Sequence, residues 1–288
     1  MSHGWLILDK PVGITSTQAG GAIKRIFKQK KIGHAGTLDP FACGVLPLAL
    51  GEATKTMPFL MSNSKTYKFT LVFGSQTSSG DTESEIVAQS DYRPTLSNLQ
   101  LALPFFTGMI WQIPPTYSAI KIKGKPAYAR TRAGETVVMS PRQVEIKKLT
   151  LDSYDGEVAV LTVDCGTGTY VRTLGQDIAI YLGAVGHLSQ LQRTRVGLFT
   201  IEHAISLENI QKISDNSRQG VLLPIGAVLD DIPAVSVSPQ EAVKIRQGQA
   251  IAMIKGDSLK VSAWYDNQII AIGHVRENLF YPGRVFNI

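Results

Sequence analysis

The clearest pattern of hydrophobic and polar positions in the chain is a strict alternation over residues 65–73. Its large apolar side chains share one face of an extended segment: Tyr67, Phe69, Leu71 and Phe73. Because successive side chains of a strand point to opposite faces, this alternation predicts a strand with one buried face. Apolar and alternating runs predict further strands over residues 5–8, 144–151, 157–164, 259–264, 268–273 and 284–287. The polar, turn-rich stretch 74–85 predicts a loop.

Apolar positions three and four residues apart predict helices elsewhere. The first helix is expected from a cap at Thr15 or Ser16 to about Gln29. Gly20 and Gly21 weaken it by roughly 1 kcal/mol each relative to alanine. Three more helices are predicted, over residues 96–106, 174–182 and 240–246.

Helical and strand patterns are interspersed up to about Pro233, and short strands with one helix follow. The predicted fold class is therefore α/β of the α+β kind, with a central mixed, largely antiparallel sheet flanked by helices. We expect a larger domain over residues 1–232 and a small β-rich domain over residues 233–288. A chain of 288 residues is long enough for this division.

The composition indicates a folded protein with a basic surface. Hydrophobic residues make up 44% of the chain and charged residues 18%, which argues against disorder. The formal net charge of +6 favours nucleic acid or an anionic membrane as partner. No apolar run approaches the length of about 18 residues that a membrane span requires, and the N-terminus lacks a signal-peptide pattern.

The two cysteines, Cys43 and Cys165, form no CxxC pair. This spacing excludes a disulfide scaffold and a standard zinc cluster, and it is typical of a protein in a reducing cytosol. We therefore expect a cytoplasmic protein without a metal.

The most basic stretch of the chain covers residues 121–142. It contains Lys121, Lys123, Lys125, Arg130, Arg132 and Arg142, with Glu135 as the one acid and several glycines and prolines between them. This composition predicts a mobile, positively charged flap that contacts phosphates. A second basic cluster lies over residues 24–31, and a solvated charged face explains it equally well.

One carboxylate stands out because its loop is tightly constrained. In Gly33-His34-Ala35-Gly36-Thr37-Leu38-Asp39-Pro40, the proline directs Asp39 toward extended backbone angles, and the glycines permit angles that other residues avoid. A solvated acid in a turn is the commoner explanation of such a loop taken alone. The motifs around it favour a functional site instead.

Four motifs follow one another in a fixed order. They are Lys10-Pro11-x-Gly13-x-Thr15-Ser16; the run from Gly33 through Gly44-Val45-Leu46-Pro47 to Gly51-Glu52-Ala53-Thr54-Lys55; Lys65-x-Tyr67 with Pro114-Pro115-x-Tyr117-Ser118-Ala119-Ile120-Lys121; and Gly168-Thr169-Tyr170-Val171-Arg172-Thr173-Leu174. In this order and spacing they resemble the TruB family of tRNA pseudouridine synthases. The resemblance covers roughly residues 4–230, and the tail from about 234 resembles a PUA-type RNA-binding module more weakly.

The resemblance implies an isomerase that converts uridine 55 in the T loop of tRNA to pseudouridine after flipping it out of the loop. It implies neither a cofactor nor a metal, and nothing in the sequence has metal-ligand spacing. The expected partner is the T arm of tRNA. We expect a monomer that requires no protein partner and no membrane.

The resemblance also assigns roles to single residues. Asp39 matches the essential carboxylate, and Arg172 matches the arginine that pairs with it and keeps it ionised. Tyr67 matches the tyrosine that stacks on the target base and helps to move its C5 proton. Tyr170 and Leu191 match positions that line the uracil pocket, and His34 matches a histidine that helps to displace the nucleotide.

Other roles remain open for some of these residues. Tyr67 and Leu191 have the pattern of ordinary core residues, and Arg172 suits a structural ion pair or a phosphate contact. For the whole chain, the alternatives are a non-catalytic tRNA-binding or tRNA-folding protein and a synthase directed by guide RNA. The combination of Asp39, Tyr67 and Arg172 favours the enzyme, because a pure RNA binder gains nothing from an anion in its binding groove.

Overall fold

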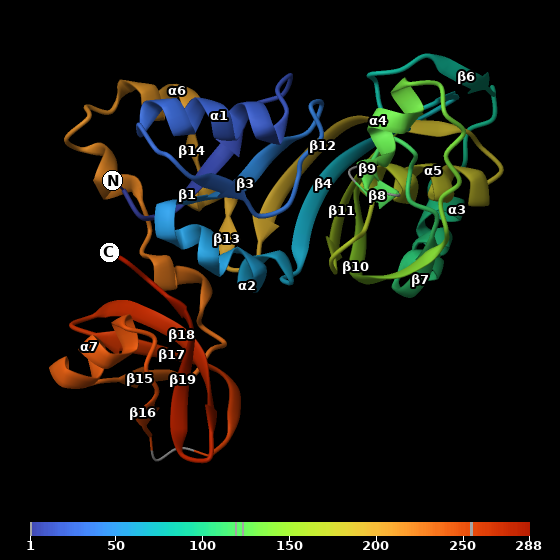
Figure 1. Cartoon of the computed structure of the whole chain (residues 1–288). Helices are drawn as coiled ribbons and strands as arrows, with labels where there is room; N and C mark the ends of the chain where they lie inside the picture. Colours follow the sequence, from blue (N-terminus) through green and yellow to red (C-terminus); the bar gives the residue numbers. More distant parts are fainter. Residues whose placement is uncertain (1, 119, 123, 254–255) are drawn as a thin grey trace.

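The fold is built on two main β-sheets joined by a short connection (Figure 1), and two further sheets in the described residues have two strands each. It is described from a computed structural model that covers residues 2–118, 120–122, 124–253 and 256–288. The larger sheet and most helices belong to the first 230 residues, and the smaller sheet contains the strands from Ala234 onward. The predicted boundary at residues 232 and 233 stays a prediction.

The larger sheet is mixed and largely antiparallel, which confirms the predicted fold class. In spatial order its strands are β14 (Ile205–Ser206), β1 (Gly4–Lys10), β3 (Cys43–Leu50), β12 (Gly186–Val196), β4 (Lys65–Phe73), β11 (Val158–Cys165), β10 (Arg142–Tyr154) and β7 (Gly108–Gln112). Two short strands lie beside this path, β2 (Ile32–His34) against β3 and β13 (Phe199–Thr200) against β12. Among the described strand pairs of this larger sheet, only β1–β14 and β3–β12 are parallel.

Most of the helices beside this sheet contribute side chains to its main core, but the helix that carries Leu60 packs in the separate buried cluster around Trp5. The helices are α1 (Ser16–Ile26), α2 (Met57–Met61), α3 (Leu96–Ala102), α4 (Ala127–Arg132), α5 (Val171–Tyr181) and α6 (Leu207–Lys212). The Thr15 side chain caps α1 in a capping box with Gln18, so the first of the two predicted caps is used. Helix α5 packs on β12 and β4, and α1 lies beside α6 (Figure 1). None of the helices in the described ranges has the length and hydropathy that crossing a bilayer takes.

The main core confirms the predicted strand faces. Tyr67, Phe69, Leu71 and Phe73 alternate with more exposed neighbours along β4, and all four belong to the core cluster under α5. Strands β10 and β11 form the expected hairpin around Asp155 and Gly156.

Three predicted boundaries were wrong. Helix α5 begins at Val171 rather than at residue 174, because Tyr170 already has extended backbone angles and ends the preceding loop. The stretch 74–85 is not only loop, since β5 (Ser75–Thr77) pairs with β6 (Ile86–Gln89). The last strand spans Leu279–Val285 instead of 284–287, and the Pro282-Gly283 pair inside it hides its strand pattern.

The smaller sheet has the order β15 (Ala234–Ser236), β17 (Ser258–Tyr265), β18 (Gln268–Arg276), β19 (Leu279–Val285) and β16 (Ile251–Ala252), with α7 (Pro239–Arg246) packed on it. A buried cluster joins the two sheets: it contains Trp5 and Ile7 of β1 together with Ile269, Ile272 and Phe286 from the end of the chain. Polar contacts reinforce the junction, since Lys55 Nζ donates to the carbonyl of Val285 at 2.6 Å. The smaller sheet is therefore packed against the larger one.

We predict that this junction contributes strongly to stability. Phe286 is 1% exposed, so Phe286→Ala leaves a cavity between the sheets and should lower the free energy of unfolding by about 3–5 kcal/mol. Phe105→Ala is the matched control, because Phe105 is 66% exposed and its loss should cost at most about 1 kcal/mol. Urea unfolding measures both. Equal midpoints for the two variants would contradict the packing described here.

Candidate active site

The predicted site residues converge on one cavity of about 380 Å³ in the larger sheet. Its walls come from the Asp39 loop, from β4 and β12, from the start of α5 and from the base of the predicted flap. Five of the six predicted catalytic and substrate-binding residues line it: Asp39, Tyr67, Tyr170, Arg172 and Leu191. A second cavity, of about 390 Å³, lies near Arg195, Leu198 and Asp231 and holds none of these residues.

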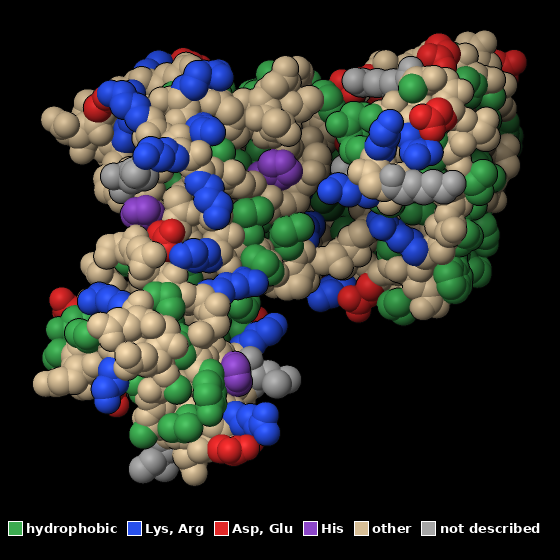
Figure 2. Space-filling view, in the orientation of Figure 1, with side chains coloured by type: hydrophobic (Ala, Val, Ile, Leu, Met, Phe, Trp, Pro, Cys, Tyr) green, Lys and Arg blue, Asp and Glu red, His purple; other side chains and the backbone are tan. Residues whose placement is uncertain are grey.

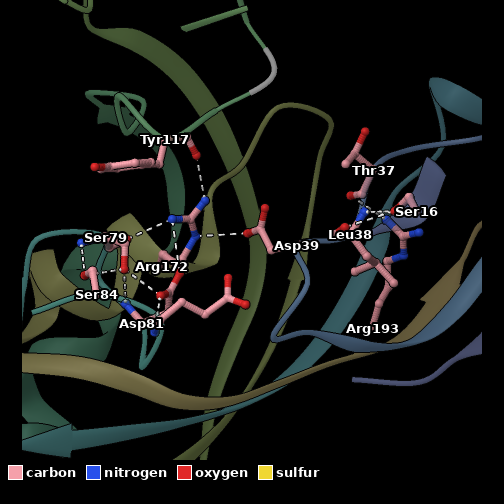
Figure 3. A network of polar contacts seen from close by, with 11 residues as sticks. Ser16, Thr37, Leu38, Asp39, Ser79, Asp81, Ser84, Tyr117, Arg172 and Arg193 are labelled. Atoms are coloured by element: carbon pink, nitrogen blue, oxygen red, sulfur yellow. Dashed lines mark hydrogen bonds and ion pairs between the residues drawn. The ribbon is translucent and has the colours of Figure 1, made fainter. Parts of the chain in front are cut away.

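The loop that carries Asp39 is fixed from three directions. The Ser16 hydroxyl of α1 donates to the carbonyl of Leu38 at 2.9 Å and accepts from its N–H at 2.8 Å. The Lys10 ammonium donates to the carbonyl of Pro40 at 3.4 Å. From below, Arg193 donates to the carbonyl of Gly36 at 3.0 Å (Figure 3). These bonds hold the loop in one conformation, with the Asp39 side chain directed at Arg172.

Arg172 lies in the first turn of α5 and uses all sides of its guanidinium group (Figure 3). Its Nε lies 3.0 Å from Oδ2 of Asp39, and its Nη1 lies 3.3 Å from Oδ2 of Asp81. It also donates to the carbonyls of Ser79, at 2.8 Å, and Tyr117, at 2.9 Å. The side chain is 4% exposed, whereas that of Asp39 is 35% exposed and faces the cavity. The predicted pairing of Asp39 with Arg172 is present.

Asp81 is a site residue that the sequence analysis missed. It is 2% exposed, and its carboxylate accepts from the Ser79 hydroxyl at 2.5 Å and from the Glu83 N–H at 2.9 Å. It therefore holds the far side of Arg172 as an anion that RNA cannot reach. The surrounding stretch has only polar and turn-forming residues, which is typical of a solvated loop, so its sequence gave no signal.

The electrostatic surroundings of Asp39 differ from the expectation. Burial raises the pKa of this carboxyl above its ordinary value; the Arg172 charge opposes the rise, and the neighbouring Asp81 adds to it. Arg172 lowers the pKa of Asp39, as the sequence analysis expected, but burial outweighs this effect and the net shift is upward. Arg172 is shared between two carboxylates, so it compensates the burial of Asp39 only in part.

Tyr67 and Leu191 belong to the core and also line the cavity. Tyr67 is 8% exposed and Leu191 is 6% exposed. Tyr170 lies half-buried at the opposite wall, where the guanidinium of Arg142 lies 5.0 Å from its ring centroid. Arg142 also donates to the carbonyl of Gly168. The cavity thus presents two aromatic side chains near a carboxylate.

His34 does not line the cavity. It lies half-buried in β2, five residues before Asp39, and its Nδ1 is buried without a hydrogen-bond partner among the described residues. Burial lowers the pKa of the imidazole, and the charge of Arg193 adds to this effect. His34 is therefore adjacent to the site through its loop and lies outside the cavity.

The base of the predicted flap meets the cavity, because Ser118 and Ile120 line it. Beyond them, β8 (Lys121–Ile122) and β9 (Lys125–Pro126) form a small hairpin that leads into α4. Lys121 and Lys125 are exposed, and Arg130 pairs with Glu135 at 2.8 Å. Lys123 and the side chain of Arg132 lie outside the described part of the structure. Figure 2 shows Lys and Arg side chains gathered around this hairpin and over α1.

The donor set around the cavity does not form a metal site. Within the described ranges, no three histidine, cysteine or carboxylate side chains are arranged to hold a metal ion. The chemistry that these residues can perform themselves is nucleophilic or electrostatic action by a carboxylate and proton transfer by a phenol.

Comparisons with known proteins define the class to which this fold and site belong. The model of the TruB family pseudouridylate synthase N-terminal domain matches residues 24–171, and that of the tRNA pseudouridylate synthase B C-terminal domain matches residues 172–230. The chain belongs to the TruB family of pseudouridine synthases and is an isomerase.

Individual relatives extend this likeness over nearly the whole chain. It is 45% identical to tRNA pseudouridine synthase B of Bradyrhizobium diazoefficiens over 99% of this chain and 86% of that protein. It is 48% identical to tRNA pseudouridine synthase B of Zymomonas mobilis over 89% of this chain and 86% of that protein. In fold it is similar to an archaeal box H/ACA Nop10–Cbf5 complex, with a TM-score of 0.73 at 20% identity over 99% of this chain and 86% of that chain.

We predict that Asp39→Asn stabilises the fold at neutral pH. The folded pKa of Asp39 is raised, so the native state holds its proton more tightly than the unfolded state, and stability falls as the pH rises through this window. Asparagine has no proton to lose, so the variant avoids this fall in stability, while Asp81 still pairs with Arg172. Urea unfolding at pH 4 and pH 7.5 (about the ordinary Asp value and well above it) measures the effect. The raised pKa would be contradicted if Asp39→Asn had no higher free energy of unfolding than the wild type at pH 7.5. It would also be contradicted if the difference between the two proteins were larger at pH 4.

Proposed function

We propose that this protein isomerises uridine 55 in the T loop of tRNA to pseudouridine, with Asp39 as the essential carboxylate. The observation that carries the proposal is the Asp39–Arg172 pair at 3.0 Å on the wall of a cavity that Tyr67 and Tyr170 also line. The relatives named tRNA pseudouridine synthase B support tRNA as the substrate.

In this reaction the glycosidic bond from N1 of uracil breaks, the base turns, and a new bond joins C5 to the sugar. Asp39 acts on the sugar or on the base ring as nucleophile or as stabilising anion. Tyr67 and Tyr170 provide surfaces for the base, and Leu191 closes the pocket. The reaction has no net redox change and transfers no group to solvent, and the resemblance implies neither a cofactor nor a metal.

The recessed position of Asp39 requires the target nucleotide to leave its loop. A cavity of about 380 Å³ accommodates a single flipped uracil with its ribose. Flipping costs a few kcal/mol of stacking, which contacts in the pocket and along the backbone offset. His34 ends β2 just before the Asp39 loop, and its proposed role is to occupy the space that the nucleotide leaves.

The cations of the flap are proposed to bind phosphates of the T arm: Lys121, Lys123, Lys125, Arg130 and Arg132. The basic cluster on α1 contributes less, since Lys28 there already pairs with Asp215 at 2.9 Å. We further propose that residues 1–232 form the catalytic domain and that residues 233–288 form a PUA-like domain that extends the RNA surface. The proposed enzyme is a cytoplasmic monomer.

A non-catalytic tRNA-binding protein is the alternative function. It would use the same basic surface but would have no need of a carboxylate shared with a buried arginine. The two functions differ in one observable, the release of hydrogen from uridine C5.

We predict that the wild type releases tritium from tRNA labelled at uridine C5 and that Asp39→Asn lowers the rate by at least about 10³-fold. Binding of the same tRNA to Asp39→Asn should remain within a few-fold, because the carboxylate contacts no phosphate. Asp152→Asn is the control, since Asp152 pairs with Lys68 away from the cavity and should keep full activity. Tight tRNA binding without any tritium release by the wild type would support the non-catalytic alternative.

We also predict that the flap cations act through phosphate contacts. Replacing Lys121 and Lys125 together by glutamine should weaken tRNA binding at all salt concentrations and reduce the slope of log K against log salt by about 1.5. A filter-binding titration over a range of salt concentrations measures this. Replacing Lys148 and Lys212, which lie outside the flap, should leave the slope unchanged. The same change in slope for both pairs would show that the flap has no special part in binding.

A further inference from the structure

Arg193 is a buried cation without a carboxylate partner among the described residues. It lies on the central strand β12, is 1% exposed, and donates to three backbone carbonyls: Nε to Val45 at 2.8 Å, Nη2 to Gly36 at 3.0 Å and Nη1 to Thr37 at 3.4 Å. Burying a charged group without an opposite charge beside it costs free energy of desolvation, and a neutral side chain would avoid that cost. The charge itself therefore calls for an explanation beyond the support of the Asp39 loop.

The side chain next to this charge is Tyr67. Arg193 and Tyr67 are direct partners across the β12–β4 pair, both line the cavity, and the guanidinium charge acts on the phenol. A guanidinium group can only donate hydrogen bonds, so it favours the phenol oxygen, and not the hydroxyl proton, on its own side. The hydroxyl proton of Tyr67 is consequently left for another acceptor, and the cavity is the space beside it.

The charged and titratable groups around Tyr67 explain what Arg193 changes. Burial raises the pKa of the Tyr67 phenol, the neighbouring Cys165 of β11 and Asp39 act in the same direction, and Arg193 opposes them. On the same strand as Tyr67, burial lowers the pKa of Lys65 to about 8, and Arg193 adds to this effect. Arg193 is thus the group that most favours negative charge on the phenol.

We propose that Arg193 is a positioning residue for the isomerisation, which orients the Tyr67 hydroxyl toward the cavity and stabilises the phenolate that takes the proton from C5 of the flipped uracil. This inference rests on the proposed function. Once the new C1′–C5 bond has formed, C5 still carries its hydrogen. The phenolate takes this proton, the C–H electron pair forms the C5=C6 double bond, and the C6=N1 pair returns to N1, which takes up a proton from water. Tyr67 then returns its proton to solvent, so no further reactant is needed.

The test compares Arg193→Gln and Arg193→Lys with the wild type in tritium release from uridine C5. We expect Arg193→Gln to lower kcat about 100-fold and Arg193→Lys less, with KM changed by less than about 3-fold because Arg193 is only 1% exposed at the cavity wall. The deficit should shrink as the pH rises, since more phenolate forms. Placing 3-fluorotyrosine, a more acidic phenol, at position 67 should restore a large part of the lost kcat in both variants.

Arg195→Gln is the matched control on the same strand. Arg195 pairs with Asp164 at 2.8 Å, lines the other cavity, and should leave kcat and its pH profile unchanged. A loss in the Arg193 variants that is equal at every pH and unaffected by 3-fluorotyrosine would reduce Arg193 to a support of the loop and overturn the inference. A kcat of wild-type size in Arg193→Gln would overturn it as well.

Two further outcomes keep the test decisive. If Arg193→Gln does not fold, Arg193→Lys with and without 3-fluorotyrosine at position 67 decides the question by the same rescue. A wild type that releases no tritium overturns the proposed function and this inference together. If the wild type releases tritium and the Arg193 variants keep the same kcat and pH profile as Arg195→Gln, only the inference about Arg193 is overturned.

Discussion

The site depends on one shared cation, because Arg172 lies between two carboxylates that it cannot fully neutralise. Asp81 is sealed beneath it, and Asp39 is open to the cavity, so the two acids have the same partner and opposite exposure. The buried Asp81 fixes the guanidinium in place, and the more exposed Asp39 remains accessible from the cavity. Burial is the main cause of the raised pKa of Asp39, and Asp81 adds to the rise while Arg172 opposes it.

The larger sheet creates this geometry by bringing distant segments to its middle strands. The strand β12 lies between β3 and β4, so the Asp39 loop before β3, the Tyr67 face of β4 and Arg193 meet at one point. Gly44 shows how close these segments are: a Cβ there would lie 2.3 Å from the carbonyl oxygen of Arg193. Glycine in this motif is therefore a requirement of strand packing beside the site.

Sequence patterns predicted the parts of the structure that depend on local order. Alternation along β4 and the helical spacing of α1 follow from hydrophobic burial, and the motifs around Asp39 and Arg172 located the ion pair. Asp81 and Arg193 were not predicted as site residues, because their importance comes from partners far away in the chain, which polarity and spacing do not reveal. The pKa of Asp39 was misjudged for the same reason, since it depends on burial and on Asp81 together.

The most direct test of this account is a map of pseudouridine in an unmodified tRNA transcript after incubation with the purified protein. The account predicts complete conversion at uridine 55, none at the other uridines, and no conversion by Asp39→Asn under the same conditions. Pseudouridine at uridine 55 formed equally well by Asp39→Asn would contradict the central role of the carboxylate held by Arg172.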